Sequence, residues 1–564
     1  MIGSPDTDGL LGRAFAQALV RLHVRMTQRW DEGAPDAAVV AALEHWGQRV
    51  WEATAEGHAC VRVDDGRARE ALAASPVVAL QQSSETPLVL DAGMLYLQRL
   101  WRAESRLAAL LVSLDTQAPL ADEASLDTVL AQVAPASEVD EQQRLAIRTA
   151  LSRRLTIGTG GPGTGKTTTL ARLLAAFSRL APGARVAIAA PTGKAAARLA
   201  QALAAQLESL ASAGGEAAAR LPAIGVTVHR LLGLRADDAA PAPGALRHDL
   251  VIVDEASMLD LELAAALAES IPAGGRLVLA GDRDQLASVE AGAVFAEACA
   301  SGLRGIVTLQ RNYRQRSAPA LSGFAAWLRQ GGIGAELPVG VAGEVEQRVP
   351  TRAEEIAAQA MAAWEPAFAA IEASAGAAQV LGAIDGHRVL CAMREGALGV
   401  AGLNAAIAAR ARRRVGARSA AVWYPGRIVM VTRNRTELGL SNGDAGVCLR
   451  DPSDPGALAV AFATGGEVRW LPVRQMPAHE DAFAITVHKS QGSEFDFVAL
   501  VPAVRGHRLN TAELLYTGAT RARRRLVVWA DAVTLEEGAG QRTVRHGWLG
   551  DRILAQRRER ETQG

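Results

Sequence analysis

Lysine is almost absent from this chain of 564 residues, although basic side chains are common. Of its 60 basic residues only three are lysine, namely Lys166, Lys194 and Lys489, and the other 57 are arginine. The abundance of alanine, glycine and arginine favours a GC-rich coding bias as the origin of this imbalance. Because a planar guanidinium cannot replace a compact ammonium everywhere, each remaining lysine is a candidate for a specific chemical role.

Net charge is missing as well, and cysteine is rare. The 60 acidic residues cancel the basic ones, which excludes a protein that binds nucleic acid or membranes over its whole surface. The four cysteines, Cys60, Cys299, Cys391 and Cys448, are too dispersed for a zinc knuckle and too few for a disulfide scaffold. The first residues lack the basic and apolar segments of a signal peptide, and no uncharged apolar run reaches the roughly 18 residues of a membrane span. We therefore expect a soluble, cytoplasmic protein without membrane contact.

The composition, 49% hydrophobic and 21% charged, is typical of a folded globular chain, and the length predicts several domains. Apolar residues at helical spacing over residues 1–115 predict a helical N-terminal domain. Residues 116–139 are more polar and are interpreted as a linker with a short helix. The charged end of the chain, from Ile553 onward, is interpreted as a frayed tail.

From about residue 140 the pattern changes to alternating strands and helices. Short apolar runs end in polar or glycine residues, which is typical of buried parallel strands with functional loops at their carboxyl ends. Examples are RLTIGTGG, RVAIAAPTG, DLVIVDEAS, RLVLAGDRD and GIVTLQRN, and a second series begins at RVLCAMREG and resumes at FAITVHKSQ. We predict two α/β domains over residues 140–335 and 336–564. Shorter strands with hairpin turns over about 424–478 predict a small β-barrel inserted into the second domain.

The first of these strands runs into a glycine-rich loop that opens a helix. The loop has the pattern G-x-x-x-x-G-K-[ST] and consists of Gly160, Gly161, Pro162, Gly163, Thr164, Gly165, Lys166 and Thr167, with Thr168 directly after it. Its glycines let backbone N–H groups and the helix N-terminus face phosphate oxygens. Lys166 is predicted to reach the β- and γ-phosphates, and Thr167 to bind magnesium. The sequence therefore predicts a P-loop nucleotide site that uses Mg²⁺.

Acidic and amide side chains follow later strands of the same predicted sheet. Asp254 and Glu255 end the strand LVIV; Asp254 would hold magnesium, mostly through water, and Glu255 would polarise the attacking water. Gln285, after the next strand, would sense the γ-phosphate. An arginine supplied across a cleft stabilises a phosphoryl group in transit, and Arg314 and Arg521 are the candidates. The predicted catalytic set is Lys166, Glu255, Gln285, Arg314 and Arg521.

Seven motifs occur in one order over roughly residues 140–530 and resemble those of superfamily 1 helicases: GGPGTGKTTTLARLL, APTGKAAARL, VIVDEASMLDL, AGDRDQLASVEAGAVF, LQRNYR, AITVHKSQGSEFD and LLYTGATRARRRL. Within that superfamily the chain resembles the RecD family, the α subunits of exodeoxyribonuclease V (RecBCD). The segments GHACVRVDD and TPLVLDAGMLYLQRLWRAE near the N-terminus share this resemblance. One departure is Ala287, where the family pattern has proline, which we expect to loosen the loop after Gln285.

The resemblance implies two RecA-like domains with ATP in the cleft between them, an N-terminal domain that docks on partner subunits, and the inserted small barrel. It also implies that Gln143 reads the adenine edge and that a β-hairpin pin precedes Asp254, where this chain has the short segment 236–245. Thr192 and Lys194 suit phosphate through their own hydroxyl and ammonium groups. The full set of predicted contacts to single-stranded DNA is Thr192, Lys194, Thr227, His229, His488, Lys489 and Ser490.

By this resemblance the chain is an ATP-driven DNA helicase that moves 5′→3′. It would be the motor of a heterotrimer with RecB-like and RecC-like subunits that processes double-strand breaks. The lack of an aromatic residue between Gln285 and Phe295 fits this polarity within the family. Two alternatives stay open: a stand-alone RecD-type helicase, and an ATPase switch that regulates partner subunits. No acidic residue stands two positions before any lysine, so no nuclease centre of the [DE]-x-K type is predicted.

Overall fold

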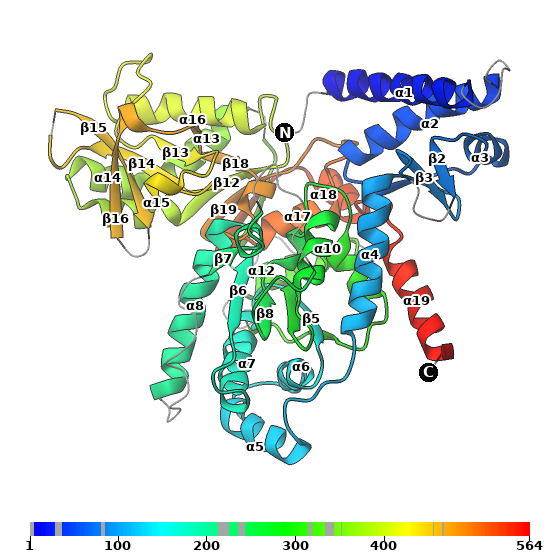
Figure 1. Cartoon of the computed structure of the whole chain (residues 1–564). Helices are drawn as coiled ribbons and strands as arrows, with labels where there is room; N and C mark the ends of the chain where they lie inside the picture. The colour runs from blue at the N-terminus through cyan, green and yellow to red at the C-terminus, as the bar shows by residue number, and fades with distance from the viewer. Residues whose placement is uncertain are drawn as a thin grey trace.

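The computed structural model describes residues 5–28, 36–80, 85–212, 225–234, 243–313, 318–332, 343–350, 352–454, 456–464 and 467–563. Figure 1 shows the N-terminal segment in blue at the upper right, a domain in cyan and green below it, and a domain in yellow and orange at the upper left. None of the helices within these ranges is long and apolar enough to cross a membrane.

The N-terminal domain contains the expected helices, together with a four-stranded sheet of order β1-β4-β3-β2 that the sequence did not predict. Its elements are α1 (Pro5–Thr27), α2 (Ala37–Ala55), β1 (Cys60–Arg62), α3 (Gly66–Ala73), β2 (Val78–Leu80), β3 (Leu88–Asp91), β4 (Met94–Leu97) and α4 (Gln98–Leu114). Each strand has only three or four residues, and β4 runs directly into α4, so no alternating pattern becomes visible. Ala92 and Gly93, at φ of 49° and 80°, form the tight turn between β3 and β4.

The first α/β domain is built on six parallel strands in the order β10-β5-β9-β8-β6-β7. Its elements are α5 (Glu123–Val133), α6 (Glu141–Ser152), β5 (Leu155–Gly160), α7 (Lys166–Leu180), β6 (Val186–Ala190), α8 (Gly193–Ser212), β7 (Val226–Thr227), α9 (Val228–Leu231), β8 (Leu250–Val253), η2 (Ala256–Met258), α10 (Leu261–Ser270), β9 (Arg276–Gly281), α11 (Val294–Ala300) and β10 (Ile306–Leu309). The five strands predicted from apolar runs are confirmed as β5, β6, β8, β9 and β10. Their side chains are almost all buried, because helices cover both faces of a parallel sheet.

Two predictions about this domain change. Helix α5 packs on α7 and buries Leu126, Leu130 and Val133 in the domain core, so the segment 116–139 is part of the domain and not a free linker. The expected pin falls partly on residues 235–242, which lie outside the described residues, and residues 243–249 form no strand.

The second α/β domain has five parallel strands in the order β11-β20-β19-β12-β18. Its elements are α12 (Pro319–Arg329), β11 (Val345–Arg348), α13 (Ala353–Ala363), α14 (Glu365–Glu372), α15 (Ala377–Asp385), β12 (His387–Cys391), α16 (Val400–Arg414), β18 (Ala484–Thr486), η6 (His488–Ser490), β19 (Phe495–Val501), α17 (Ala512–Ala519), β20 (Ala522–Trp529) and α18 (Ala532–Gly540). Helix α12 packs on α17 and β20 and buries Phe324 and Trp327 in this domain's core. Helix α12 therefore packs with the second α/β domain, although it precedes residue 335.

A five-stranded antiparallel sheet of order β16-β15-β14-β13-β17 is inserted between α16 and β18. Its elements are β13 (Ile428–Val431), η4 (Thr436–Leu438), β14 (Ala445–Arg450), β15 (Leu458–Thr464), β16 (Glu467–Pro472), η5 (Val473–Gln475) and β17 (His479–Asp481). Val429, Cys448 and Phe462 are buried in its own small core. Within the described residues the edge strands β16 and β17 do not pair with each other, so the predicted barrel is an open sheet.

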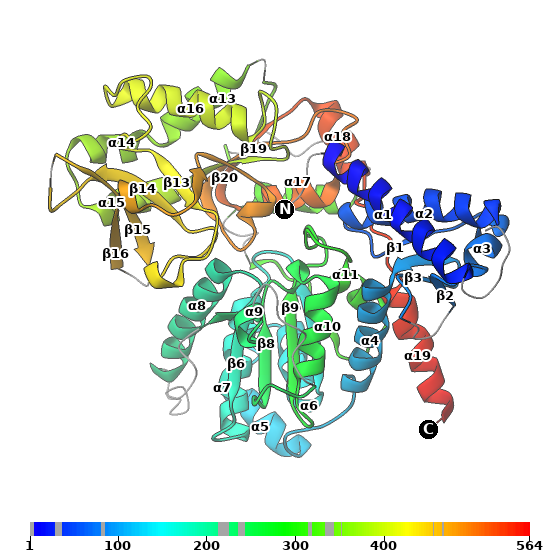
Figure 2. The same ribbon diagram turned by 45° about the horizontal axis from the view of Figure 1, so that its top comes forward.

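The end of the chain leaves the second α/β domain and forms α19 (Leu549–Gln563). Figures 1 and 2 show α19 beside α4, where it also packs on α11 and buries Leu549 and Ile553. Arg552 pairs with Asp91 at 2.7 Å and with the buried Glu104 at 2.8 Å. The predicted frayed tail is therefore a packed helix that ties the end of the chain to the N-terminal domain.

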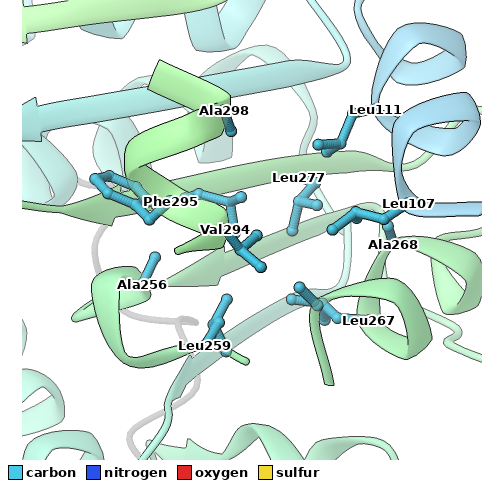
Figure 3. Close-up of a pocket in the computed structure, with 12 residues that line it drawn as sticks. Leu107, Leu111, Ala256, Leu259, Leu267, Ala268, Leu277, Val294, Phe295 and Ala298 are labelled. Carbon is cyan, nitrogen blue, oxygen red and sulfur yellow. The ribbon is translucent and has the colours of Figure 1, made fainter. Parts of the chain in front are cut away.

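Helix α4 joins the N-terminal domain to the first α/β domain through an apolar interface. Figure 3 shows Leu107 and Leu111 of α4 on one side of a small apolar pocket that Leu277 of β9 and Val294 and Ala298 of α11 also line. Burying a leucine side chain stabilises a protein by about 1.5–3 kcal/mol. Several such side chains meet here, and they hold α4 on this sheet.

Candidate active site and DNA path

The P-loop connects β5 to α7 and holds its lysine inside the turn. The Nζ of Lys166 donates to the carbonyl oxygens of Gly160 at 2.5 Å and Gly161 at 3.3 Å. The Thr164 hydroxyl donates to the same Gly161 carbonyl at 2.8 Å. Thr167 lies in the first turn of α7, a helix of 15 residues. An ammonium group and a helix N-terminus thus meet at one point, which suits phosphate groups.

A buried glutamine and a tyrosine contact the same loop. Gln143, which is 2% exposed, donates from Nε2 to the Thr164 carbonyl at 3.4 Å and accepts at Oε1 from the Tyr313 hydroxyl at 3.1 Å. The Tyr313 backbone N–H donates to the Gly163 carbonyl at 2.8 Å. A Cβ at Gly165, where φ is 82°, would lie 2.3 Å from Gln143 Nε2, so only glycine fits there. Tyr313 is not among the residues predicted from sequence, although its place in LQRNYR was a usable signal.

The acidic pair follows β8 at the same edge of the sheet. The backbone N–H of Asp254 donates to the Ala189 carbonyl at 3.0 Å, and that of Glu255 donates to Asp254 Oδ1 at 2.9 Å. Glu255 has a left-handed backbone, with φ of 52° and ψ of 36°, a strain that clusters at functional sites. Burial and the charge of Glu255 raise the pKa of Asp254, while Lys166 lowers it. The predicted metal-binding carboxylate therefore lies within electrostatic reach of the P-loop ammonium.

Gln285 and Arg521 meet across the cleft between the two α/β domains. The Arg521 guanidinium, 3% exposed, donates from Nη2 to Gln285 Oε1 at 2.7 Å. The second domain also holds the backbone of Leu286, the residue after Gln285. The Leu286 N–H donates to the Thr517 hydroxyl at 2.8 Å, and the Leu286 carbonyl accepts from Gln491 Nε2 at 3.0 Å. The loop that was expected to be loosened by Ala287 is therefore tied to the second domain.

A pocket opens beside the P-loop between the two domains. Gly161 and Pro162 line it from the first domain, and Ser322 and Thr520 line it from the second. Arg314, the other candidate arginine, lies outside the described residues.

Four of the predicted DNA-contacting residues lie at the carboxyl edge of β6 and β7. Thr192 and Thr227 accept hydrogen bonds, at 3.3 Å and 3.1 Å, from backbone N–H groups three residues further on, so their hydroxyls hold the starts of α8 and α9. They lie close together, since a Cβ at Gly193 would be 4.0 Å from the Thr227 methyl carbon. His229 is exposed, and a Cβ at Gly492 of the second domain would be 3.7 Å from Thr192 Oγ1.

The two lysines of the predicted path face acidic residues of the second domain. Burial lowers the pKa of Lys194, while Asp385 and Asp444 raise it. The Nζ of Lys489 is ion-paired with Glu480 of β17. A DNA phosphate at either lysine would therefore have a protein carboxylate as its competitor.

His488 is half-buried and Ser490 is fully buried. Burial, with Arg545 and Arg394 nearby, lowers the pKa of His488 to about 4, so its ring is neutral at pH 7. Ser490 is 0% exposed and its hydroxyl donates to the Val487 carbonyl at 2.7 Å. The prediction that Ser490 contacts DNA is therefore corrected: its side chain holds the backbone of η6.

Comparisons with known proteins agree with this geometry. The chain matches the AAA domain family over residues 138–341 and the UvrD-like helicase C-terminal domain family over residues 481–529. The RecBCD enzyme subunit RecD of Mycobacterium tuberculosis is 38% identical over 483 residues, which cover 82% of this chain and 80% of that protein. The chain belongs to the RecD family. It is therefore a superfamily 1 helicase motor, an ATP-dependent DNA helicase and hydrolase.

The chain is also similar to proteins other than RecD. The ATP-dependent RecD2 DNA helicase of Deinococcus radiodurans is 31% identical over 520 residues, which cover 88% of this chain and 64% of that protein. The crystal structure of Bacteroides Pif1 bound to ssDNA aligns with 75% of this chain and 97% of that one, at 16% identity and a TM-score of 0.40. The more even coverage of RecD than of RecD2 favours a RecD-type chain over the stand-alone helicase.

Proposed function

We propose that this RecD-family chain is the 5′→3′ motor subunit of a heterotrimer that processes DNA double-strand breaks. The observation that carries the proposal is the hydrogen bond between Arg521 and Gln285, because it joins the two domains beside the P-loop. An arginine of one domain that reaches the nucleotide edge of the other makes hydrolysis depend on closure of the cleft. Repeated closing and opening would advance the chain along one strand.

In this proposal the P-loop and its neighbours bind ATP. Lys166 and the loop N–H groups would bind the phosphates, and Gln143, which is hydrogen-bonded to the P-loop and to Tyr313, would recognise the adenine edge. Glu255 polarises the attacking water. Arg521, together with Arg314, stabilises the charge that develops on the transferred phosphoryl group.

Thr167 and Asp254 fit the magnesium ion that the fold family uses. Mg²⁺ prefers oxygen ligands and is usually held by one or two carboxylates together with substrate phosphates and water. The raised pKa of Asp254 marks a carboxylate whose charged form a cation would stabilise. When bound, the ion neutralises charge on the β- and γ-phosphates.

The DNA strand would pass over the carboxyl edges of both sheets. Thr192, Lys194 and Thr227 supply contacts from the first domain. Exposed His229 extends that surface, and His488 and Lys489 supply contacts from the second domain. Because the whole chain carries no net charge, such local groups must provide the attraction to phosphate.

The N-terminal domain is the proposed docking domain for the RecB-like and RecC-like subunits. Leu10 and Leu11 on α1 are 63% and 48% exposed, which supports a partner surface there. A motor that uses ATP and chromosomal DNA would act in the cytoplasm.

Stopped-flow unwinding of duplexes with a 5′ or a 3′ tail tests the proposal. The wild-type chain alone should unwind only the 5′-tailed duplex, and Lys166→Gln should abolish this unwinding. Arg558→Gln, which changes an exposed arginine of α19, serves as a control that keeps full activity. Unwinding from the 3′ tail would reject the polarity, and the absence of any ATP-dependent unwinding would reject the motor. Co-purification with two large subunits, lost when α1 is removed, tests the assembly separately.

A further inference from the structure

The hydroxyl of Tyr516 crosses the interface between the two α/β domains. Tyr516 lies on α17 of the second domain, is 3% exposed, and donates from its hydroxyl to Asp282 Oδ2 at 2.9 Å. Asp282 follows β9 of the first domain and is 2% exposed. A hydrogen bond to a carboxylate is strong when neither partner has water as an alternative. Neither the predicted catalytic set nor the predicted DNA contacts include Tyr516.

The same carboxylate oxygen holds Gln285. Gln285 Nε2 donates to Asp282 Oδ2 at 3.1 Å, and Gln285 Oε1 accepts from Arg521 at 2.7 Å. The backbone N–H of Asp284 donates to the other oxygen of Asp282 at 3.1 Å. Both ends of the Gln285 amide therefore have defined partners, and Asp282 fixes the direction in which it points.

Tyr516 also lies against the P-loop. A Cβ added to Gly161 would be 2.8 Å from the tyrosine hydroxyl oxygen, so the phenol and the loop backbone are in close contact. The carbonyl of Gly161 accepts from Lys166 at 3.3 Å. The tyrosine hydroxyl thus lies between the phosphate-binding loop and the residue predicted to sense the γ-phosphate.

The phenol keeps its proton and acts as a donor. Burial and the neighbouring Asp282 raise the pKa of Tyr516 well above its ordinary value. Arg329 and Asp284 also face it and have opposite effects on that pKa. The phenol is therefore the donor in the hydrogen bond to Asp282 Oδ2.

We propose that Tyr516 is a positioning residue for ATP hydrolysis: through Asp282 it orients the Gln285 amide when the second domain closes on the first. Tyr516 shares α17 with Thr517, and Arg521 follows two residues after the helix, so all three side chains move with that domain. The inference rests on the proposed ATP hydrolysis at the P-loop. It identifies Tyr516 as the side chain that couples closure of the second domain to the orientation of Gln285. Because Tyr516 acts through Asp282, its loss should change the rate of hydrolysis and not the binding of ATP.

Tyr516→Phe tests this by removing one oxygen atom and keeping the ring. In a DNA-stimulated ATPase assay with oligothymidylate we expect kcat to fall about tenfold while KM for ATP changes less than about twofold. Tyr424→Phe is the matched control, because Tyr424 is also buried in the second domain but its hydroxyl has no partner among the described residues. Wild-type kcat in Tyr516→Phe, with an intact fold, would overturn the inference.

If Tyr516→Phe folds poorly, Asp282→Asn tests the same contact from the acceptor side. It should lower kcat to a similar degree with KM unchanged, and the double variant should be no slower than the slower single variant, because both changes act on one contact. Wild-type kcat in Asp282→Asn, or losses that multiply in the double variant, would also overturn the inference. Absence of ATPase in the wild-type chain, or an active Lys166→Gln variant, would instead count against the proposed function.

Discussion

Arg521 of the second α/β domain donates a hydrogen bond of 2.7 Å to the side-chain carbonyl of Gln285 in the first. Its Nε and Nη1 donate to carbonyls of its own domain, those of Thr517 at 3.1 Å and Ser493 at 3.3 Å. One guanidinium therefore ties Gln285 to the framework of α17. A lysine at this position could not make these contacts together, because its single ammonium lacks the fork geometry.

Arg521→Lys should lower kcat for ATP hydrolysis about a thousandfold, the lower end of the effect of arginines that stabilise phosphoryl transfer. Gln285→Ala should lower it less. The double variant should be as slow as Arg521→Lys alone, since residues that act as one unit are not additive. Steady-state ATPase assays measure all three, with Arg524→Lys on the exposed side of β20 as the control. If the fold losses of kcat in the two single variants multiply in the double variant, Arg521 and Gln285 do not work as a unit.

On the proposed DNA path, Glu480 would compete with a DNA phosphate for the ammonium of Lys489. Their side chains are 38% and 30% exposed, so the ion pair itself adds little stability and can exchange with a phosphate. Lys489→Gln should weaken binding of oligothymidylate and lower the slope of log affinity against log salt by about 0.7. Glu480→Gln should tighten binding. Fluorescence anisotropy at several salt concentrations measures both effects.

Charge alone does not explain the choice of lysine at this position. Lys489→Arg should keep the salt slope yet impair DNA-stimulated ATPase, because a guanidinium spreads its charge over a planar fork. The same result is expected for Lys194→Arg. If both variants keep wild-type ATPase activity, arginine can replace lysine at these positions, and the presence of the lysines in the motifs is a coincidence.

The sequence predicts best those strands and loops whose pattern extends over several consecutive residues. The strands β5, β6, β8 and β9 have four to six residues, almost all buried, and end in motif residues, so both the sheet and the P-loop are visible in the chain itself. Strands of three residues, such as β1, cannot show an alternating pattern. Helix α19 looks like a solvated tail because most of its residues are charged or polar and its docking depends mainly on Leu549, Ile553 and Arg552.

Contacts between distant segments are the part of the site that sequence reasoning missed. Tyr313 contacts Gln143 over 170 positions, and Tyr516 contacts Asp282 over 234. Both tyrosines lie in motifs, LQRNYR and LLYTGATRARRRL, but the local pattern does not reveal which distant residues they contact. The fold of the first domain brings Tyr313 to Gln143, and the arrangement of the two domains brings Tyr516 to Asp282.

Arg552 is expected to be the main tie between the end of the chain and the N-terminal domain. Its partner Glu104 is 1% exposed, so Arg552→Met would leave a buried carboxylate without its cation. The free energy of unfolding should fall by about 3–5 kcal/mol. Urea denaturation followed by tryptophan fluorescence measures this, because Trp101 and Trp548 both contact the carboxylates of this cluster. Arg558→Met, on the exposed face of the same helix, should change stability by less than about 0.5 kcal/mol.

Glu297 on α11 should make the docking of α19 depend on pH. Its carboxylate accepts from the Gly550 N–H at 3.3 Å, at the start of α19. Burial and the nearby charge of Glu104 raise the pKa of Glu297 from 4.5 to about 7. Between these values the folded protein holds a proton that the unfolded chain releases, so this carboxyl group makes folding less favourable as pH rises from about 4.5 to 7.

Glu297→Gln should remove that effect while keeping the acceptor for Gly550. The variant should gain stability relative to the wild type as pH rises from 4.5 to 7, by at most about 3 kcal/mol. His58 and His488, whose pKa values are lowered to about 4, titrate with the opposite sign but are present in both proteins, so the difference isolates Glu297. Urea denaturation at a series of pH values gives this difference, and the exposed Glu561→Gln is the control. Parallel stability curves for the wild type and Glu297→Gln would mean that this carboxyl group keeps its ordinary pKa in the folded protein.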